Sequence, residues 1–293
     1  MLFRSVILLL FAQAQGSKSP GPPSPGFLIP ALGRYNGVMK VISLQSGSNG
    51  NCIYVEADGV RLLFDAGISG RQAEQRLAAH GRDIRDVDAL VISHEHRDHS
   101  RCMGIYQRKY GMPVHVTRKT LSASRSRHDL GEITDLRPYA AGSSLHFGTV
   151  TVETISTPHD GVDGVAFVVD DGQHRLGILT DLGHVFDGLE AVIASLDAVL
   201  VESNYDPAML DEGFYPEPLK RRIRGAGGHL SNVQSAELLR TSAGTRLKWV
   251  CLGHLSEENN NSELALNTHR EMLGDRVPLF VAGRDAATDV IEL

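Results

Sequence analysis

The chain has 293 residues, of which 42% are hydrophobic and 22% charged, and its formal net charge is −6. This composition suits an α/β domain and excludes bulk positive charge as a driving force for binding nucleic acid, so such binding depends on a local patch. The three cysteines, Cys52, Cys102 and Cys251, are widely spaced without a C-x-x-C pair. They argue against a disulfide framework and favour a reducing compartment.

Residues 1–38 differ in composition from the rest of the chain. Arg4 precedes a short apolar run at residues 6–11 and an Ala-Gln-Ala sequence at 12–14, which are features of a weak signal peptide. The run is too short to span a bilayer, and "SKSPGPPSPGF" has the composition of a disordered linker. We expect a disordered extension over 1–38, most simply an over-extended translation start, and one folded domain over 39–293. The expected location is cytoplasmic, with export through the N-terminal segment as the alternative.

The folded part is predicted to begin with strands. Short β-branched runs at 40–46, 51–57 and 60–67 are separated by Gly, Ser and Asn, which is typical of a meander. Ser69 and Gln72 form a capping box that predicts a helix to residue 79, ended by Gly81. A buried strand at 87–93 and a helix from about 99 to 110 follow.

The second half alternates strands and helices. Apolar runs predict strands at 113–117, 150–156, 164–170, 174–180, 197–203 and 247–253. The polar stretch between the first two of these receives no element. Ser231 and Gln234 predict a capped helix to about residue 239, and residues 262–273 predict another. This order indicates an α/β protein.

The stretch "VISHEHRDHS" places His94, His96, Asp98 and His99 within six positions after an apolar run. Alternate residues of an extended loop point the same way, so His94 and His96 can bind one ion while Asp98 and His99 reach a second. Imidazole and carboxylate donors without a thiolate suit Zn²⁺, Fe or Mn²⁺, and do not indicate a closed structural zinc site. A solvated polar turn or a run of helix caps is the alternative.

Three further residues of the metal-binding type follow predicted strands. His159 comes soon after the strand at 150–156, Asp181 directly after 174–180, and His254 directly after 247–253. Strand ends on a shared rim of an α/β core are the usual place for a site. The sequence therefore predicts a metal centre built from four strand ends.

"SHEHRDHS", with the earlier "LLFDAG", resembles the signature of the metallo-β-lactamase fold superfamily over residues 39–293. The resemblance implies a four-layer αβ/βα sandwich of two mixed β-sheets with helices outside. It also implies two divalent metal ions, Zn²⁺ or Mn²⁺, with Asp65 orienting the ligands. The implied ligands are His94, His96 and His159 for one ion, Asp98, His99 and His254 for the other, and Asp181 as a bridge.

Longer stretches, among them "SLQSGSNGNCIYVE", "VLVESNYDPAML", "GGHLSN" and "GHLSEENNN", resemble the YycJ/WalJ-type proteins. That family comprises bacterial metallo-hydrolases regarded as DNA exonucleases and related to tRNase Z. Arg97 departs from the family, whose members often carry an uncharged, smaller residue there. The resemblance implies a phosphodiesterase acting on DNA, with no membrane partner.

His229 lies two positions before the Ser231 cap, at a predicted helix N-terminus, where free N–H groups and the helix dipole favour phosphate. It could bind a phosphate oxygen or protonate a leaving oxygen, or it could simply pack in a Gly-rich turn. We predict Asp98, Asp181 and His229 as catalytic residues. His128 and His184 are not assigned as ligands.

Basic residues recur in two segments. The stretch at 117–129 is too loose to assign. The segment "LKRRIR" is either a solvated helix face or a local patch that binds phosphates. Its basic residues are Lys220, Arg221, Arg222 and Arg224.

Two other functions remain open from the residues. A thioesterase of the glyoxalase II type, or a lactonase, uses an almost identical ligand set, although "GGHLSN" and "LKRRIR" argue against it. A non-catalytic metal-binding module would be expected to lack a ligand, and no implied ligand is missing here.

Overall fold

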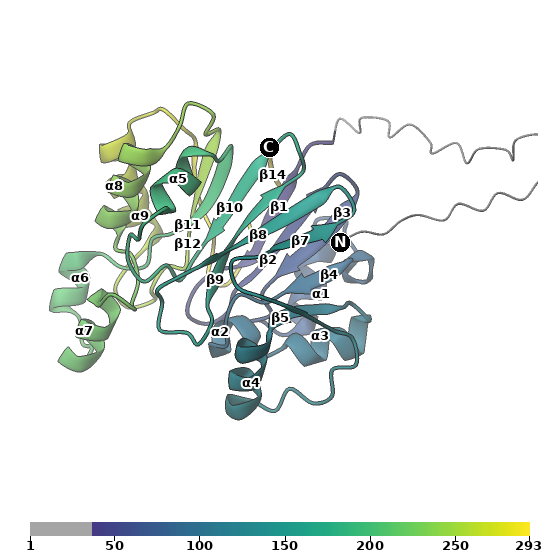
Figure 1. The fold of residues 1–293 in the computed structure, drawn as a ribbon. Coiled ribbons are helices and arrows are strands. Elements are labelled where there is room, and N and C mark those ends of the chain that lie inside the picture. The colour runs from purple at the N-terminus through teal and green to yellow at the C-terminus, as the bar shows by residue number, and fades with distance from the viewer. Residues whose placement is uncertain (1–36) are drawn as a thin grey trace, which may run out of the picture. The chain divides into compact units, whose positions relative to one another are not determined.

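The computed structural model describes residues 37–293 (Figure 1). The predicted disordered extension, signal peptide or over-extended start at 1–38 falls, apart from its last two residues, outside the described part. The boundary at residue 39 stays a prediction, and the first strand begins at Lys40. No helix within residues 37–293 is long and apolar enough to cross a membrane.

Two seven-stranded mixed sheets form the centre of the described part. In each sheet a parallel set of strands adjoins an antiparallel set. In spatial order the first sheet contains β14 (Ile291–Glu292), β1 (Lys40–Gln45), β2 (Cys52–Ala57), β3 (Val60–Phe64), β4 (Ala89–Val91), β5 (Val114–Thr117) and β6 (Leu136–Tyr139). The second contains β13 (Leu279–Val281), β12 (Trp249–Gly253), β11 (Ala198–Glu202), β10 (Arg175–Leu179), β9 (Val165–Asp170), β8 (Val150–Ser156) and β7 (Ser144–Phe147).

The two sheets pack face to face around one apolar core. Val41 and Phe64 of the first sheet share this core with Phe167 and Leu200 of the second. The rings of Phe64 and Phe167 lie with their centroids 5.0 Å apart. Burying each such side chain stabilises the fold by about 1.5–3 kcal/mol. The strand ends that carry the candidate site are therefore fixed to a rigid core.

Helices cover the outer face of each sheet (Figure 1). Leu77 and Tyr106 pack on the first sheet, and Ile193 and Leu239 pack on the second. The first layer comprises α1 (Gly70–Ala79), α2 (Arg97–Ser100), α3 (Met103–Tyr110), α4 (Arg118–Arg127) and the short 3₁₀ helix η1 (Ile84–Asp86). The second comprises α5 (Leu189–Ala194), α8 (Asn232–Ser242) and α9 (Ser262–Leu273), with α6 (Pro207–Glu212) and α7 (Glu217–Arg224) beside it. The predicted four-layer sandwich is confirmed.

Some elements differ from expectation. The helix expected over 99–110 is two helices, α2 and α3. The polar stretch that received no element contains α4, capped by the side chain of Thr117. This helix buries only Thr120 and Ser124, so it lacks the apolar stripe by which an amphipathic helix is found in a sequence.

Candidate metal centre

The candidate centre lies where strands of both sheets end. His94 follows β4, Asp181 follows β10 and His254 follows β12. Asp65, Asp181 and His254 have left-handed backbones, with φ of 65°, 56° and 55°. Residues other than glycine rarely adopt this conformation, and such strain concentrates at functional sites. The chain thus turns sharply at three strand ends that meet at one site.

The structure brings all seven predicted ligands together. Within each of several groups, one donor atom per residue lies within 4.8 Å of every other. Asp181 occurs in a group with His94 and His99 and in another with His254, so it lies between the two sets, where a bridging ligand is expected. The two sets are His94, His96 and His159, and Asp98, His99 and His254.

Two buried polar atoms without hydrogen-bond partners among the described residues indicate that these residues suit a metal ion. Nε2 of His94 and Oδ2 of Asp181 are buried without a hydrogen bond to any described residue, and each such atom costs about 1–3 kcal/mol. Nδ1 of His159 donates to the carbonyl of Gly228 at 2.8 Å, and its Nε2 faces Nδ1 of His96 at 3.2 Å. A cation between these nitrogens would satisfy both. That the residues bind metal stays a prediction.

Hydrogen bonds behind the histidines fix their orientation. Asp65 Oδ2 accepts from Nδ1 of His99 at 2.7 Å and from the hydroxyl of Ser93 at 2.9 Å. The Ser93 oxygen in turn lies 2.9 Å from Nδ1 of His94. Because Nδ1 of both rings is used behind the site, Nε2 is left for a metal. Asp65 therefore lies where the predicted orienting residue should.

The electrostatics of the centre favour a cation. Burial alone would lower the pKa of His254, but the carboxylates of Asp181 and Asp98 raise it to about 9. Burial, reinforced by the charge of His99, lowers the pKa of His94 well below its usual value. A neutral imidazole is the form that binds a metal, and the carboxylates offset the charge of the ion.

His229 occupies the edge of this centre, with its ring centroid 4.9 Å from that of His159 and 5.2 Å from that of His254. Its Nδ1 lies 2.5 Å from Oε1 of Glu202. The sequence reading missed Glu202, which is fully buried at the end of β11. The available signal was its place at a strand end, the signal that marked Asp181.

Two other polar residues were also missed. Asp160 lies with Oδ1 3.4 Å from Nε2 of His96, and its second oxygen accepts from Arg222 at 2.6 Å. Asn51 lies with Nδ2 2.9 Å from Nε2 of His99. Both residues come from loops without a metal-binding pattern, so only the tertiary structure identifies them.

A cavity of about 350 Å³ opens above the centre. Arg97, Arg127 and His128 lie on one side and the α7 residues on the other. Figure 1 places α4 and α7 at the same end of the sandwich, at the bottom of the view. The residues that line the cavity are Ser48, His96, Arg97, Asp98, Arg127, His128, Asp181, Asn204, Tyr215, Leu219, Arg222, Ile223, His229, His254 and Ser256.

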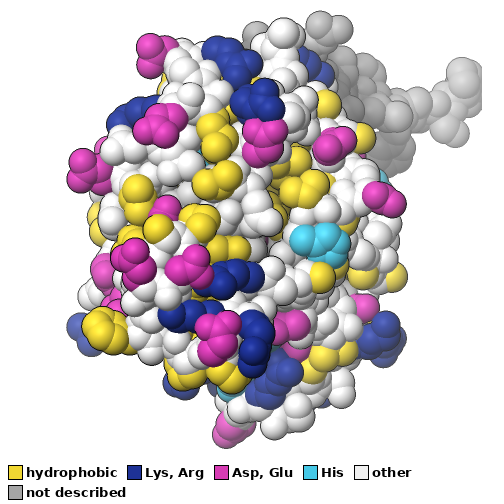
Figure 2. Space-filling view, turned by 90° about the vertical axis from the view of Figure 1, so that its left-hand side faces the viewer, with side chains coloured by type: hydrophobic (Ala, Val, Ile, Leu, Met, Phe, Trp, Pro, Cys, Tyr) yellow, Lys and Arg dark blue, Asp and Glu magenta, His cyan; other side chains and the backbone are white. Residues whose placement is uncertain are grey.

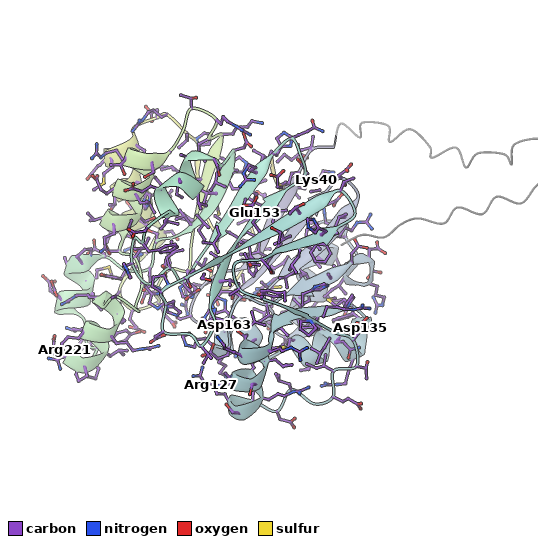
Figure 3. The ribbon with its side chains drawn as sticks, in the orientation of Figure 1. Lys40, Arg127, Asp135, Glu153, Asp163 and Arg221 are labelled. Atoms are coloured by element: carbon purple, nitrogen blue, oxygen red, sulfur yellow. The ribbon has the colours of Figure 1, made fainter. Side chains whose placement is uncertain are left out.

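The four basic residues of α7 lie in different environments. Lys220 Nζ donates to the carbonyl of Asp211 at 2.6 Å, and Arg224 pairs with the Asp211 carboxylate. Arg221 projects outward (Figure 3), and only Arg222 of the four lines the cavity. Lys and Arg side chains gather with acidic ones over this region of the surface (Figure 2).

The histidines not assigned as ligands lie apart from the donor groups. Nδ1 of His184 hydrogen-bonds the carbonyl of Ala226 at 2.7 Å, outside the cavity lining. His128 lines the cavity but belongs to no metal-binding group.

Comparison with known proteins places this centre in a family. Residues 60–250 match the sequence model of a beta-lactamase superfamily domain. The chain belongs to the metallo-β-lactamase superfamily. Within it, the chain is 39% identical over 261 residues to exodeoxyribonuclease WalJ of Streptococcus pneumoniae serotype 2, covering 85% of this chain and 96% of WalJ. It is 35% identical over 235 residues to exodeoxyribonuclease YycJ of Bacillus anthracis, covering 80% and 88% of the two chains.

A solved structure of the same superfamily shares the fold. The metallo-beta-lactamase fold protein YhfI of Bacillus subtilis superposes with a TM-score of 0.67 at 16% identity, over 88% of this chain and all of YhfI. The superfamily fold implies divalent metal ions, and the histidine and aspartate groups described above provide donors for them.

Proposed function

We propose that this protein is a metal-dependent exonuclease that hydrolyses phosphodiester bonds in DNA. The observation that carries the proposal is the pair formed by His229 and the buried Glu202, which share a donor group with Asp181 and His254. A histidine supported by a carboxylate can protonate the oxygen that leaves when the backbone is cut. The relatives WalJ and YycJ, both named exodeoxyribonucleases, support the same reaction.

Two divalent ions, Zn²⁺ or Mn²⁺, would be held by the seven residues predicted from the sequence. Imidazole and carboxylate donors suit both metals. When bound, such ions lower the pKa of water and stabilise negative charge on the phosphoryl oxygens. The first ion would be held by His94, His96 and His159, the second by Asp98, His99 and His254, and Asp181 would contact both.

The chain's own groups would control the proton movements. Asp98 and Asp181 border the cavity floor, where their carboxylates can orient the attacking water by accepting its hydrogen bonds. Glu202 holds His229 by Nδ1, so Nε2 is the ring nitrogen available to the cavity. From there it can donate a proton to the leaving oxygen or hold a phosphate oxygen.

The lining of the cavity supports a nucleotide as the substrate. Arg97, Arg127 and His128 provide donors for phosphate oxygens, whereas Tyr215 and the apolar side chains of α7 offer a surface for a base. The thioester or lactone group itself carries no phosphate for these arginines to bind.

We also propose a reducing compartment such as the cytosol. Cys52, Cys102 and Cys251 are free thiols, and each is buried. A protein whose three cysteines stay unpaired is suited to a compartment that keeps thiols reduced.

The experiment that tests the function compares substrates in a His229→Ala variant. Purified protein with Mn²⁺ or Zn²⁺ is assayed against end-labelled duplex DNA, single-stranded DNA, RNA, and a thioester and lactone panel. We expect DNA hydrolysis from one end, reduced about 10²–10⁴-fold in His229→Ala with metal content unchanged. A thioester side activity, where present, should fall far less.

The control is His184→Ala, which replaces a nearby histidine outside the cavity lining. It should retain the activity of the natural sequence. Turnover of the thioester panel without any phosphodiester cleavage would overturn the proposal, and so would equal losses on both substrate classes in His229→Ala. Reduced metal content in His229→Ala would mean instead that His229 is a ligand.

A further inference from the structure

Arg97 is a free guanidinium at the mouth of the site. It lies between His96 and Asp98 at the first position of α2, and it lines the cavity with its side chain exposed. Its side chain makes no hydrogen bond or ion pair with any of residues 37–293. Arg127 and Arg222, which line the same cavity, are each held by a carboxylate, Glu95 and Asp160 respectively. Arg97 is therefore available to a ligand in a way that these two arginines are not.

His128 lies beside it with an unsatisfied ring nitrogen. Nε2 of His128 is buried and has no hydrogen-bond partner in the described part of the chain. The pKa of His128 is lowered, first by burial and then by the charges of Arg97, Arg127 and Arg101. Three arginines thus act on one histidine, and a neutral ring still offers one N–H donor. The local field is positive although the whole chain carries a net charge of −6.

We propose that Arg97 and His128 form a second phosphate subsite, which binds the backbone phosphate next to the one that is cut, while the charge of Arg127, itself held by Glu95, adds to the positive field there. The inference rests on the proposed function. Arg97 is joined in sequence to two predicted metal ligands, so a phosphate at its guanidinium and a phosphate at the metal centre can belong to successive nucleotides of one strand. A guanidinium can bind two phosphate oxygens at once, and the ring N–H of His128 can add a third contact.

The opposite wall fixes the direction in which the base lies. Tyr215, Leu219 and Ile223 face the cavity from the α7 side. A nucleotide with its phosphates along Arg97 and His128 would place its base against this wall, where stacking on an aromatic ring does not depend on base identity. The subsite therefore contributes affinity for a strand of at least two phosphates and no sequence preference.

The test removes the negative charge of the backbone phosphate and the positive charge of Arg97, first separately and then together. KM and kcat are measured on an oligodeoxynucleotide with natural linkages and on one with a single neutral methylphosphonate next to the scissile bond. The natural enzyme should show a KM about 10-fold higher on the methylphosphonate, because a charged hydrogen bond is lost. Arg97→Gln should show about the same increase on the natural oligonucleotide and only a small further increase on the methylphosphonate, since the two changes remove mostly the same interaction and only the contact with His128 remains to be lost.

Arg125→Gln is the matched control, because Arg125 is an exposed residue of α4 that does not line the cavity. It should keep the natural KM and the full methylphosphonate effect. His128→Asn keeps an N–H donor but moves it. It should raise KM on the natural oligonucleotide and reduce the methylphosphonate effect, in both cases by less than Arg97→Gln.

Two results would overturn the subsite. One is a methylphosphonate effect of equal size in the natural enzyme and in Arg97→Gln. The other is the absence of that effect from the natural enzyme. Equilibrium binding of the same oligonucleotides, followed by fluorescence anisotropy in EDTA, tests the subsite even if the protein cleaves no phosphodiester. If no phosphodiester is cleaved, the proposed function fails. The difference in affinity between the natural and the methylphosphonate oligonucleotide then decides whether the subsite exists.

Discussion

Nδ1 of His229 lies 2.5 Å from Oε1 of Glu202, a carboxylate with no solvent exposure. The other oxygen of Glu202 accepts from the backbone N–H groups of Leu182 and Leu230, at 3.1 and 3.2 Å. The carboxylate therefore joins the loop after Asp181 to the turn that carries His229, and its contact with Nδ1 fixes the orientation of the imidazole ring.

The first prediction concerns Glu202→Gln, which keeps the shape of the side chain and removes its charge. Hydrolysis of DNA should fall about 100-fold, because His229 loses the carboxylate that contacts its Nδ1 and positions the ring for proton transfer. Bis(p-nitrophenyl) phosphate, whose leaving group needs no proton, should lose less than about 10-fold. A residue with a purely structural role would lower both rates together.

Metal content of Glu202→Gln, measured by mass spectrometry, should match that of the natural protein. Glu190→Gln on α5 is the control, because Glu190 is exposed. Loss of metal from Glu202→Gln would assign Glu202 to the metal centre itself, in keeping with its place in a donor group with Asp181 and His254.

The second prediction concerns Gly67, which lets two loops of the site approach each other. A Cβ at this position would lie 1.7 Å from the carbonyl oxygen of Asp98. That carbonyl also accepts from the backbone N–H of Asn51 at 2.7 Å, so it cannot move freely. Gly67→Ala should destabilise the fold by about 3 kcal/mol or more in urea unfolding and weaken metal binding.

Gly59→Ala is the control for this effect, since a Cβ there meets nothing within 4 Å. Its φ of +80° still makes alanine unfavourable, and we expect a cost of about 1 kcal/mol with metal binding intact. Gly67 has no left-handed backbone, so equal costs at the two positions would show that the contact with the Asp98 carbonyl is relieved at little cost and would contradict the prediction.

The clustering of the predicted ligands could be inferred from the sequence more readily than the polar groups around them. His94, Asp181 and His254 each follow an apolar run that is a strand in the structure, so the rim of strand ends could be inferred. Asp160 and Asn51 lie in loops, and nothing local indicates that they reach the histidines. Their positions depend on contacts between distant segments, which a single sequence does not show.

Which helices could be predicted also depended on local signals in the sequence. The capping boxes at Ser69 and Ser231 are both present, so the start of α1 and the start of α8 were predictable. No apolar periodicity marks α4, because its buried positions are the polar residues Thr120 and Ser124. Arg127 and His128 reach the cavity only because this polar helix forms, and the sequence reading therefore left that wall unassigned.

The third prediction concerns pH and His269, which is fully buried between α8 and α9. Its Nδ1 hydrogen-bonds the carbonyl of Ala265, and Nε2 lies 3.3 Å from the hydroxyl of Ser235. Burial lowers the pKa of His269 from 6.5 to about 4. The unfolded chain then binds more protons between these values, so stability falls with falling pH by about 1.4 kcal/mol per unit in this window.

Urea unfolding in EDTA at pH 7 and pH 5 measures this effect without a contribution from metal release. His269→Gln should lose about 2 kcal/mol less than the natural protein between the two pH values. His146→Gln, at an exposed strand position, is the control. An unchanged pH dependence in His269→Gln would mean that the pKa of this ring is the same in the folded and the unfolded chain.

The last prediction tests the bridging position of Asp181. Its φ of 56° lies in the left-handed region, where asparagine is tolerated almost as well as aspartate and alanine is not. Asp181→Asn therefore removes the charge while it keeps the shape and backbone of this residue. We expect the variant to fold, and to lose nearly all activity, because its carboxylate lies among donors of both predicted metal sets.

Metal analysis distinguishes a bridge from a ligand of one ion. Loss of Asp181 as a bridge should weaken binding of both ions, whereas loss of a terminal ligand should release one and leave the other at full occupancy. Asp187→Asn, at an exposed position of the same loop, is the control and should bind metal normally. Two tightly bound ions and full turnover in Asp181→Asn would rule out the bridging role. One ion bound at full occupancy would place Asp181 in a single set.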